Sequence, residues 1–192
     1  YPDEIKKAHA KDKYQEEVEF LVLNEARNKF IRNLALSLKG NTLLLYNFVD
    51  KHGKPLYRDI KNAIDKSVDK RNIYFVSGEV KGSEREEIRH IVETQNDAII
   101  VASYGTFSTG INIKQLNNIV FCSPSKSRIR VMQSIGRGLR RSETKTTATL
   151  FDLADNLTWK SKPNYTLNHF AERLKMYNDE KFEYKMYRIK IK

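Results

Sequence analysis

The sequence has 192 residues, of which 40% are hydrophobic and 31% charged, so it can bury a core and does not look disordered. Its 35 lysines and arginines outnumber 24 acidic residues, and the net charge of +11 favours a polyanionic partner, nucleic acid before an anionic membrane surface. The single cysteine, Cys122, excludes an intrachain disulfide and a multi-cysteine zinc site. No apolar run approaches the roughly 20 residues of a membrane-spanning helix, so we expect no membrane partner. The single cysteine fits a reducing compartment, and we expect a cytoplasmic protein.

The first part of the chain is predicted to contain a polar N-terminal segment followed by helices. Residues 1–13 are polar and lysine-rich, which is typical of a linker or interdomain arm. The opening Tyr1-Pro2 is neither an initiator nor part of a signal peptide, so we expect a piece of a longer protein. Apolar residues recur at helical spacing over residues 14–38, and Asn24 is a candidate break between two helices.

The middle of the chain alternates short apolar runs with helical segments. Strands are predicted at residues 42–48, 72–76, 97–102, 118–122 and 148–153, and helices at 56–68, 84–93 and 127–141. Strands separated by crossovers pair in parallel, so residues 14–155 predict an α/β domain with helices on both faces of a parallel sheet.

The pattern changes after Asn156, where a polar loop precedes an amphipathic helix near residues 165–177. The alternating tail after that helix, residues 182–192, is compatible with an edge strand. We treat residues 156–192 as a C-terminal extension of helix and tail.

Arginines and glycines are concentrated in residues 133–141, with the sequence QSIGRGLRR. On a helix Gln133, Arg137 and Arg140 fall within a narrow arc. Gly136 inside a helix costs about 1 kcal/mol relative to alanine, so close approach by a ligand or another backbone explains it. Guanidinium groups bind phosphate oxygens bidentately. A solvated basic helix face is the alternative, and the glycines and spacing favour a phosphate site.

The other candidate residues follow the first three predicted strands, at the edge where ligands bind in such folds. Residues 103–112 offer glycines and hydroxyls to a phosphate or ribose, although an ordinary turn has the same composition. Residues 47–53 and 77–82 each carry a lysine and small residues that would suit a sugar-phosphate backbone, or would serve as plain connections. His52 has no cysteine or histidine nearby, so no metal site is predicted.

The order of these segments resembles the second RecA-like domain of superfamily 2 helicases. Residues 42–53 resemble motif IV, residues 77–92 the segment after it, residues 99–121 motif V, and residues 133–141 motif VI with its Gln-x-x-Gly-Arg-x-x-Arg spacing. The resemblance runs from about residue 15 to residue 153, and four motifs in the right order make it specific.

The resemblance implies roles for the motif VI residues. Arg140 would be the arginine finger on the γ-phosphoryl group of ATP, and such fingers are worth roughly 10³–10⁵ in rate. Arg137 would be its companion on the phosphates. Gln133 would couple the nucleotide to the neighbouring domain, and Gly136 would lie at the nucleotide.

The same resemblance implies roles in motif V and in the loops. Gly110 would lie close to the nucleotide, and Asn112 stands where the family usually has an aspartate contacting the ribose, so that contact would lack a charge. The nucleic-acid backbone would be contacted by Ser103, Lys51, Ser77, Gly78 and Lys81.

Two elements of an ATP site are missing from the sequence: a G-x-x-x-x-G-K-[ST] loop and an acidic strand end for Mg²⁺. We therefore expect this chain to hold half of an ATP site, an N-terminal RecA-like domain of the same protein to hold Mg²⁺ and the other half, and the fragment alone to be inactive. The particular likeness to phage recombination and repair helicases implies action on single-stranded or branched DNA and on RNA–DNA hybrids, in the host cytoplasm. The alternatives are the motor subunit of a restriction-type translocase and a nucleic-acid-binding module without catalysis.

Overall fold

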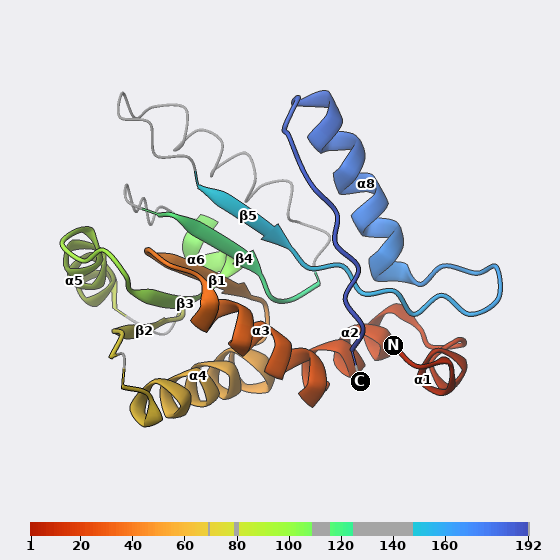
Figure 1. The fold of residues 1–192 in the computed structure, drawn as a ribbon, viewed down its shortest axis with the longest axis horizontal. Coiled ribbons are helices and arrows are strands. Elements are labelled where there is room, and N and C mark those ends of the chain that lie inside the picture. The colour runs from red at the N-terminus through yellow and green to blue at the C-terminus, as the bar shows by residue number, and fades with distance from the viewer. Residues whose placement is uncertain (69, 79–80, 109–115, 125–147, 192) are drawn as a thin grey trace.

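A five-stranded parallel sheet forms the centre of the molecule (Figure 1). The computed structural model describes residues 1–68, 70–78, 81–108, 116–124 and 148–191. The strands are β1 (Thr42–Tyr46), β2 (Ile73–Val76), β3 (Ile99–Ser103), β4 (Asn118–Phe121) and β5 (Thr149–Asp152). Their order in the sheet is β2-β3-β1-β4-β5, and every pairing is parallel. The predicted α/β fold with a parallel sheet is thereby confirmed.

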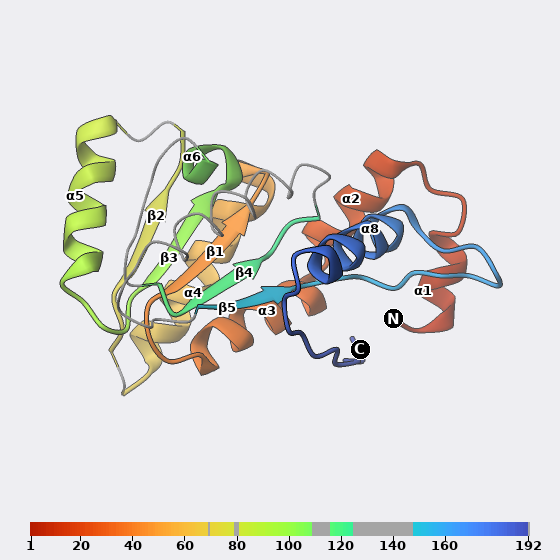
Figure 2. The ribbon, with the colours of Figure 1, turned by 90° about the horizontal axis from the view of Figure 1, so that it is seen from above.

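Helices cover both faces of this sheet (Figure 2). The helical elements are α1 (Asp3–Ala8), α2 (Tyr14–Leu23), α3 (Glu25–Ser37), a π-helical turn η1 (Val49–Gly53), α4 (Lys54–Lys66), α5 (Gly82–Glu93), α6 (Tyr104–Ser108) and α8 (Tyr165–Asp179). Helices α3 and α4 pack on one face, while α5, α6 and α8 contribute to the core on the other.

The central strand β1 shows why its sequence is an unbroken apolar run. Alternate side chains of a strand point to opposite faces, and both faces of this sheet are covered. Leu43 and Leu45 enter the core under α5 and α8, whereas Leu44 and Tyr46 enter the core under α3 and α4. All four side chains are fully buried.

Most predicted elements form, with ends shifted by a few residues. The predicted break at Asn24 is confirmed: its side-chain oxygen accepts the N–H of Arg27 at 2.8 Å and caps α3. The helix predicted at residues 127–141 lies outside the described residues. The tail is not an edge strand, because the described residues 182–191 adopt no strand pairing.

The C-terminal extension is held against the sheet domain by two buried carboxylates. Glu17 of α2 accepts the backbone N–H of Tyr165 at 2.9 Å and of Thr166 at 2.7 Å, so it caps α8 from another helix. Asp152, at the end of β5, accepts Nε and Nη2 of Arg173 at 2.6 and 2.9 Å. The start of α8 is therefore tied to α2, and its middle to the end of β5.

The first thirteen residues contain the short helix α1, and Tyr1 lies at their start. The Tyr1 hydroxyl donates a hydrogen bond to Asp155 at 2.7 Å, and the His9 ring stacks on Phe20 of α2 with 3.8 Å between centroids. Among the helices in the described part of the chain, none combines the length and the apolar character needed to cross a bilayer.

Candidate functional site

The described candidate residues gather along one edge of the sheet. Because the strands are parallel, their carboxyl ends all meet there. Lys51 follows β1, Ser77, Gly78 and Lys81 follow β2, and Ser103 is the last residue of β3. This is the edge at which open α/β sheets bind ligands.

The nucleotide-binding candidates lie in two other segments of the chain. Gly110 and Asn112 fall in residues 109–115, and Gln133, Gly136, Arg137 and Arg140 fall in residues 125–147, all outside the described residues. The roles assigned to these six residues stay predictions.

Ser103 caps the short helix that follows β3. Its buried Oγ accepts the N–H of Thr106 at 3.1 Å and lies 2.7 Å from the Thr106 hydroxyl oxygen. The serine thereby fixes the direction in which the chain leaves the strand. Its hydroxyl is thus already used within the protein, and a nucleic-acid contact would share it.

Lys51 lies on η1 and pairs with Glu19 of α2. Both side chains are more than half exposed, at 59% and 52%, so the pair contributes at most about 1 kcal/mol. A phosphate group could therefore replace Glu19 as the partner of Lys51 at a small cost in free energy.

The loop after β2 combines a buried residue with exposed ones. Ser77 is buried, while Gly78 and Lys81 are exposed. A Cβ added at Gly78 would meet no atom within 4 Å, so the loop backbone is open to an incoming ligand at this point. Lys81 immediately precedes α5, where its ammonium group is available at the surface.

A buried histidine, which the sequence did not single out as structural, joins three elements beside this edge. Asn28 donates its amide N–H to the carbonyl of Val22, so its Oδ1 accepts from His52 Nε2 at 3.0 Å. His52 Nδ1 therefore accepts from the Ser123 hydroxyl at 2.7 Å, and Ser123 Oγ in turn accepts the N–H of Asn47 at 3.1 Å. The network locks η1 to α3 and to the segment after β4.

Burial and the nearby Arg27 guanidinium lower the pKa of His52 to about 3, which keeps the ring neutral. Neutrality is what the network needs, since Nδ1 must accept a hydrogen bond. No group of three or more metal-ligating side chains gathers within the described residues.

Arg27 is another buried polar residue whose role the sequence did not reveal. Its Nε contacts both carboxylate oxygens of Asp155 at 2.9 and 3.0 Å, and its Nη1 donates to the carbonyl of Cys122 at 2.8 Å. Burial and the negative charge of Asp155 raise the pKa of the Tyr1 hydroxyl, so Tyr1 stays a donor to Asp155. A single ion pair therefore ties α3, the end of β4, the chain after β5 and the first residue together.

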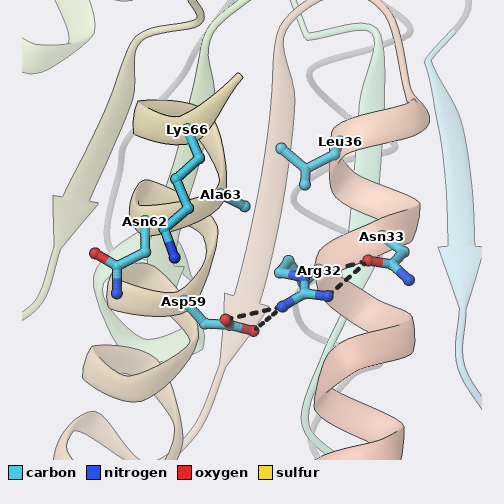
Figure 3. A pocket seen from close by; sticks show the side chains of 7 residues that line it. All are labelled: Arg32, Asn33, Leu36, Asp59, Asn62, Ala63 and Lys66. Carbon is cyan, nitrogen blue, oxygen red and sulfur yellow. Dashed lines mark hydrogen bonds and ion pairs between the residues drawn. The ribbon is translucent and has the colours of Figure 1, made fainter.

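A groove of about 270 Å³ lies between α3 and α4, away from these residues (Figure 3). Arg32 of α3 crosses it and donates to Asp59 of α4 at 3.0 Å. Since α4 starts near the carboxyl edge and Lys66 at its far end lines the groove, the groove is displaced toward the opposite edge. It includes none of the described site candidates.

The sheet order, the all-parallel pairing and the loops at its carboxyl edge define an α/β domain of the RecA-like class. The sequence profile of the helicase conserved C-terminal domain matches residues 25–142, and the chain belongs to this family. The resemblance to the second RecA-like domain of superfamily 2 helicases is thereby confirmed.

One similar protein is the ATP-dependent DNA helicase uvsW of Enterobacteria phage T4, with 39% identity over 204 aligned positions. The alignment covers 100% of this chain and 39% of that protein, so the chain spans about two fifths of its relative's length.

The fold agrees with solved structures. The crystal structure of T4 UvsW matches with a TM-score of 0.78 and 38% identity, over 94% of this chain and 38% of that one. The C-terminal part of the Fun30 ATPase domain matches with a TM-score of 0.54 over 96% of this chain and 63% of that one. At 10% identity, the second match shows the fold alone.

Proposed function

We propose that this chain is the second motor domain of an ATP-dependent DNA helicase or translocase. The observation that carries the proposal is its membership of the helicase C-terminal family together with 39% identity to a protein named as an ATP-dependent DNA helicase. The carboxyl edge supports it, because lysines and small residues follow successive strands there.

In this proposal ATP binds in a cleft between this domain and an N-terminal RecA-like domain of the same protein. The N-terminal domain holds Mg²⁺, and this chain contributes Arg140 as the arginine finger and Arg137 on the phosphates. Gln133, Gly136, Gly110 and Asn112 complete this side of the nucleotide site. The fragment by itself should hydrolyse little ATP.

The domain division follows from the same proposal. Residues 14–155 form the motor domain, residues 1–13 the arm that connects it to the N-terminal domain, and residues 156–192 an extension. The two domains would close when ATP binds and separate after hydrolysis. In each cycle Ser103, Lys51 and the loop from Ser77 to Lys81 would bind backbone phosphates and then release them. The substrates would be single-stranded or branched DNA and RNA–DNA hybrids during phage recombination and repair, in the host cytoplasm.

Replacing the proposed finger in the full-length protein tests this function. Arg140→Ala should lower DNA-stimulated ATP hydrolysis by roughly 10³–10⁵-fold, because no other group would neutralise the charge on the γ-phosphoryl oxygens. DNA affinity, measured by fluorescence anisotropy, should stay near that of the wild type.

The matched control is Arg141→Ala, which removes the same charge one position outside the Gln-x-x-Gly-Arg-x-x-Arg spacing. It should retain most of the hydrolysis rate. If Arg140→Ala weakened DNA binding and left hydrolysis intact, the arginine would belong to the nucleic-acid surface instead. If the full-length protein hydrolysed ATP without moving along or separating DNA, the non-catalytic binding module or another motor class would replace the helicase.

A further inference from the structure

The C-terminal tail leaves α8 through a defined turn. The N–H of Phe182 bonds to the carbonyl of Tyr177 at 2.9 Å, and the N–H of Lys181 bonds to that of Asn178 at 3.1 Å. These two bonds, with Lys181 at a φ of 56°, make a Schellman motif, and the Phe182 and Tyr177 rings supply its apolar contact. The turn sends the chain back beside α8, toward the side of the molecule where α1 and α2 lie (Figure 1).

Beyond this turn the tail has few partners. Among the described residues, the backbone of 183–191 makes no main-chain hydrogen bond. The Tyr184 hydroxyl donates to Asn178, and the Tyr184 ring lies 6.2 Å from that of Tyr177. All of residues 181–190 are exposed.

Large apolar side chains are exposed along this segment. Tyr187 is 79% exposed, Met186 68%, Ile189 54%, Tyr184 44% and Phe182 42%. A run of exposed aromatic and aliphatic side chains of this kind marks an interaction site rather than a neutral surface.

The charge of the tail indicates what it binds. Lys181, Lys185, Arg188 and Lys190 alternate with the apolar residues, and Glu183 is the one acid among residues 181–190. None of these four cations forms an ion pair within the part of the chain that the structure describes. The segment therefore presents positive charge that no acidic side chain among the described residues pairs with.

Three kinds of partner could bind such a segment: a protein strand, an anionic membrane and a nucleic acid. Cations interleaved with aromatic rings along an extended chain match a strand of phosphates with free base faces, which is the chemistry of single-stranded nucleic acid. A duplex hides its base faces, and a membrane would favour separate apolar and basic sides over residue-by-residue alternation.

We propose that residues 181–190 are an accessory binding segment for single-stranded nucleic acid, in which Tyr187 and Tyr184 stack on bases while Lys185, Arg188 and Lys190 contact phosphates. The proposal rests on the proposed function for the identity of the polymer, and it places this contact outside the helicase motifs. The helix α8, which carries the tail, is capped by Glu17 of α2, and α2 also pairs with Lys51 through Glu19. The tail is thus attached, through α8 and α2, to the element that contacts Lys51, one of the proposed nucleic-acid-binding residues.

The test measures binding of a fluorescein-labelled oligothymidylate and of a 20-base-pair duplex to the full-length protein by anisotropy at several salt concentrations. Tyr187→Ala should weaken oligothymidylate binding roughly tenfold, and Tyr187→Phe should restore it, because phenylalanine keeps the stacking face. Lys185→Gln/Arg188→Gln/Lys190→Gln should reduce the slope of log affinity against log salt by about 2. Duplex binding should change little in all variants.

The matched control is Lys29→Gln/Lys61→Gln/Lys66→Gln, which removes the same charge from exposed positions on α3 and α4. Equal losses in the two triple variants, or no loss in either tail variant, would overturn the proposal while leaving the proposed function intact. A tail variant that lost binding to phosphatidylserine vesicles in place of oligothymidylate would overturn it in favour of a membrane contact. Failure of the wild-type protein to bind any nucleic acid would instead count against the proposed function itself.

Discussion

At the scale of single residues, Gly53 and Tyr46 fix how the chain turns from η1 into α4. A Cβ at position 53 would lie 2.5 Å from Cε2 and Cζ of the Tyr46 ring. That ring cannot retreat easily, because it stacks on Phe75 with 5.7 Å between centroids and its hydroxyl donates to the carbonyl of Val76. Only glycine fits between η1 and the end of β1 without displacing this stack.

We therefore expect Gly53→Ala to lower the free energy of unfolding by about 1–3 kcal/mol, the usual cost of overpacking. This cost exceeds the gain of up to about 1 kcal/mol that alanine normally brings to a helical position. Urea denaturation of the purified chain measures it. Gly78→Ala is the control, since a Cβ there meets no atom within 4 Å, and it should change stability by less than about 0.5 kcal/mol. Similar losses in both variants would contradict the close approach at Gly53.

The buried imidazole of His52 makes stability depend on pH. Its pKa is about 3 in the folded state, lowered by burial and by Arg27, against about 6.5 in the unfolded chain. Between these two values the unfolded state binds one more proton, so stability is lost as the pH falls below about 6.5 and recovers as it rises.

From pH 7.5 to pH 5.0 this effect should lower the free energy of unfolding by roughly 2 kcal/mol, at about 1.4 kcal/mol per pH unit below 6.5. Urea denaturation at both values checks it, with His52→Gln as the reference because glutamine keeps a hydrogen-bonding side chain without a titrating ring. The variant should lose about 2 kcal/mol less than the wild type over the same interval. Parallel losses in the two proteins would show that other groups cause the acid sensitivity.

At the scale of elements, α2 and α8 form one unit although 141 residues separate the end of the first from the start of the second. The joint is Glu17, which is 3% exposed and accepts from the Asn164 side-chain amide as well as from two N–H groups of α8. Its negative charge at the helix N-terminus adds to these hydrogen bonds. The extension therefore depends on a residue near the other end of the chain.

Glu17→Ala should destabilise the protein by about 2–3 kcal/mol, because it leaves buried N–H groups of α8 without an acceptor. Hydrogen exchange should accelerate at the amides of Tyr165 and Thr166 more than in the sheet. The control on the same helix is Glu19→Ala, which breaks an exposed ion pair with Lys51 and should cost less than about 1 kcal/mol. Unchanged exchange at the start of α8 in the Glu17 variant would contradict the capping role.

At the scale of the whole molecule, parallel pairing collects loops that are far apart in sequence. Lys51 and Gly78 follow β1 and β2, Ser103 ends β3, and all three reach one edge because these strands run in the same direction. The tail and the first residues also come together, since the two termini lie side by side in both views (Figures 1 and 2). The tail carries a part of the net charge of +11, since residues 181–190 contain four lysines and arginines and one acidic residue.

The sequence by itself determined the fold class and the family. Apolar runs such as residues 42–46 are local signals, because a strand covered on both faces needs apolar residues at every position. The break at Asn24 and the helicase motifs are likewise recognised from short stretches of sequence. Interactions between residues close in sequence produce patterns that can be identified in the sequence alone.

Only the tertiary structure decided which polar residues are buried and what they join. Nothing near His52 in sequence indicates Asn28 or Ser123 as partners, and nothing near Glu17 indicates α8. Such hydrogen bonds depend on the packing of elements many residues apart, which no periodicity records. The tail illustrates the same limit: its alternation was compatible with an edge strand, but a strand needs a neighbour to pair with. The turn at Lys181 leads the tail along α8, and the described backbone of residues 183–191 makes no main-chain hydrogen bond.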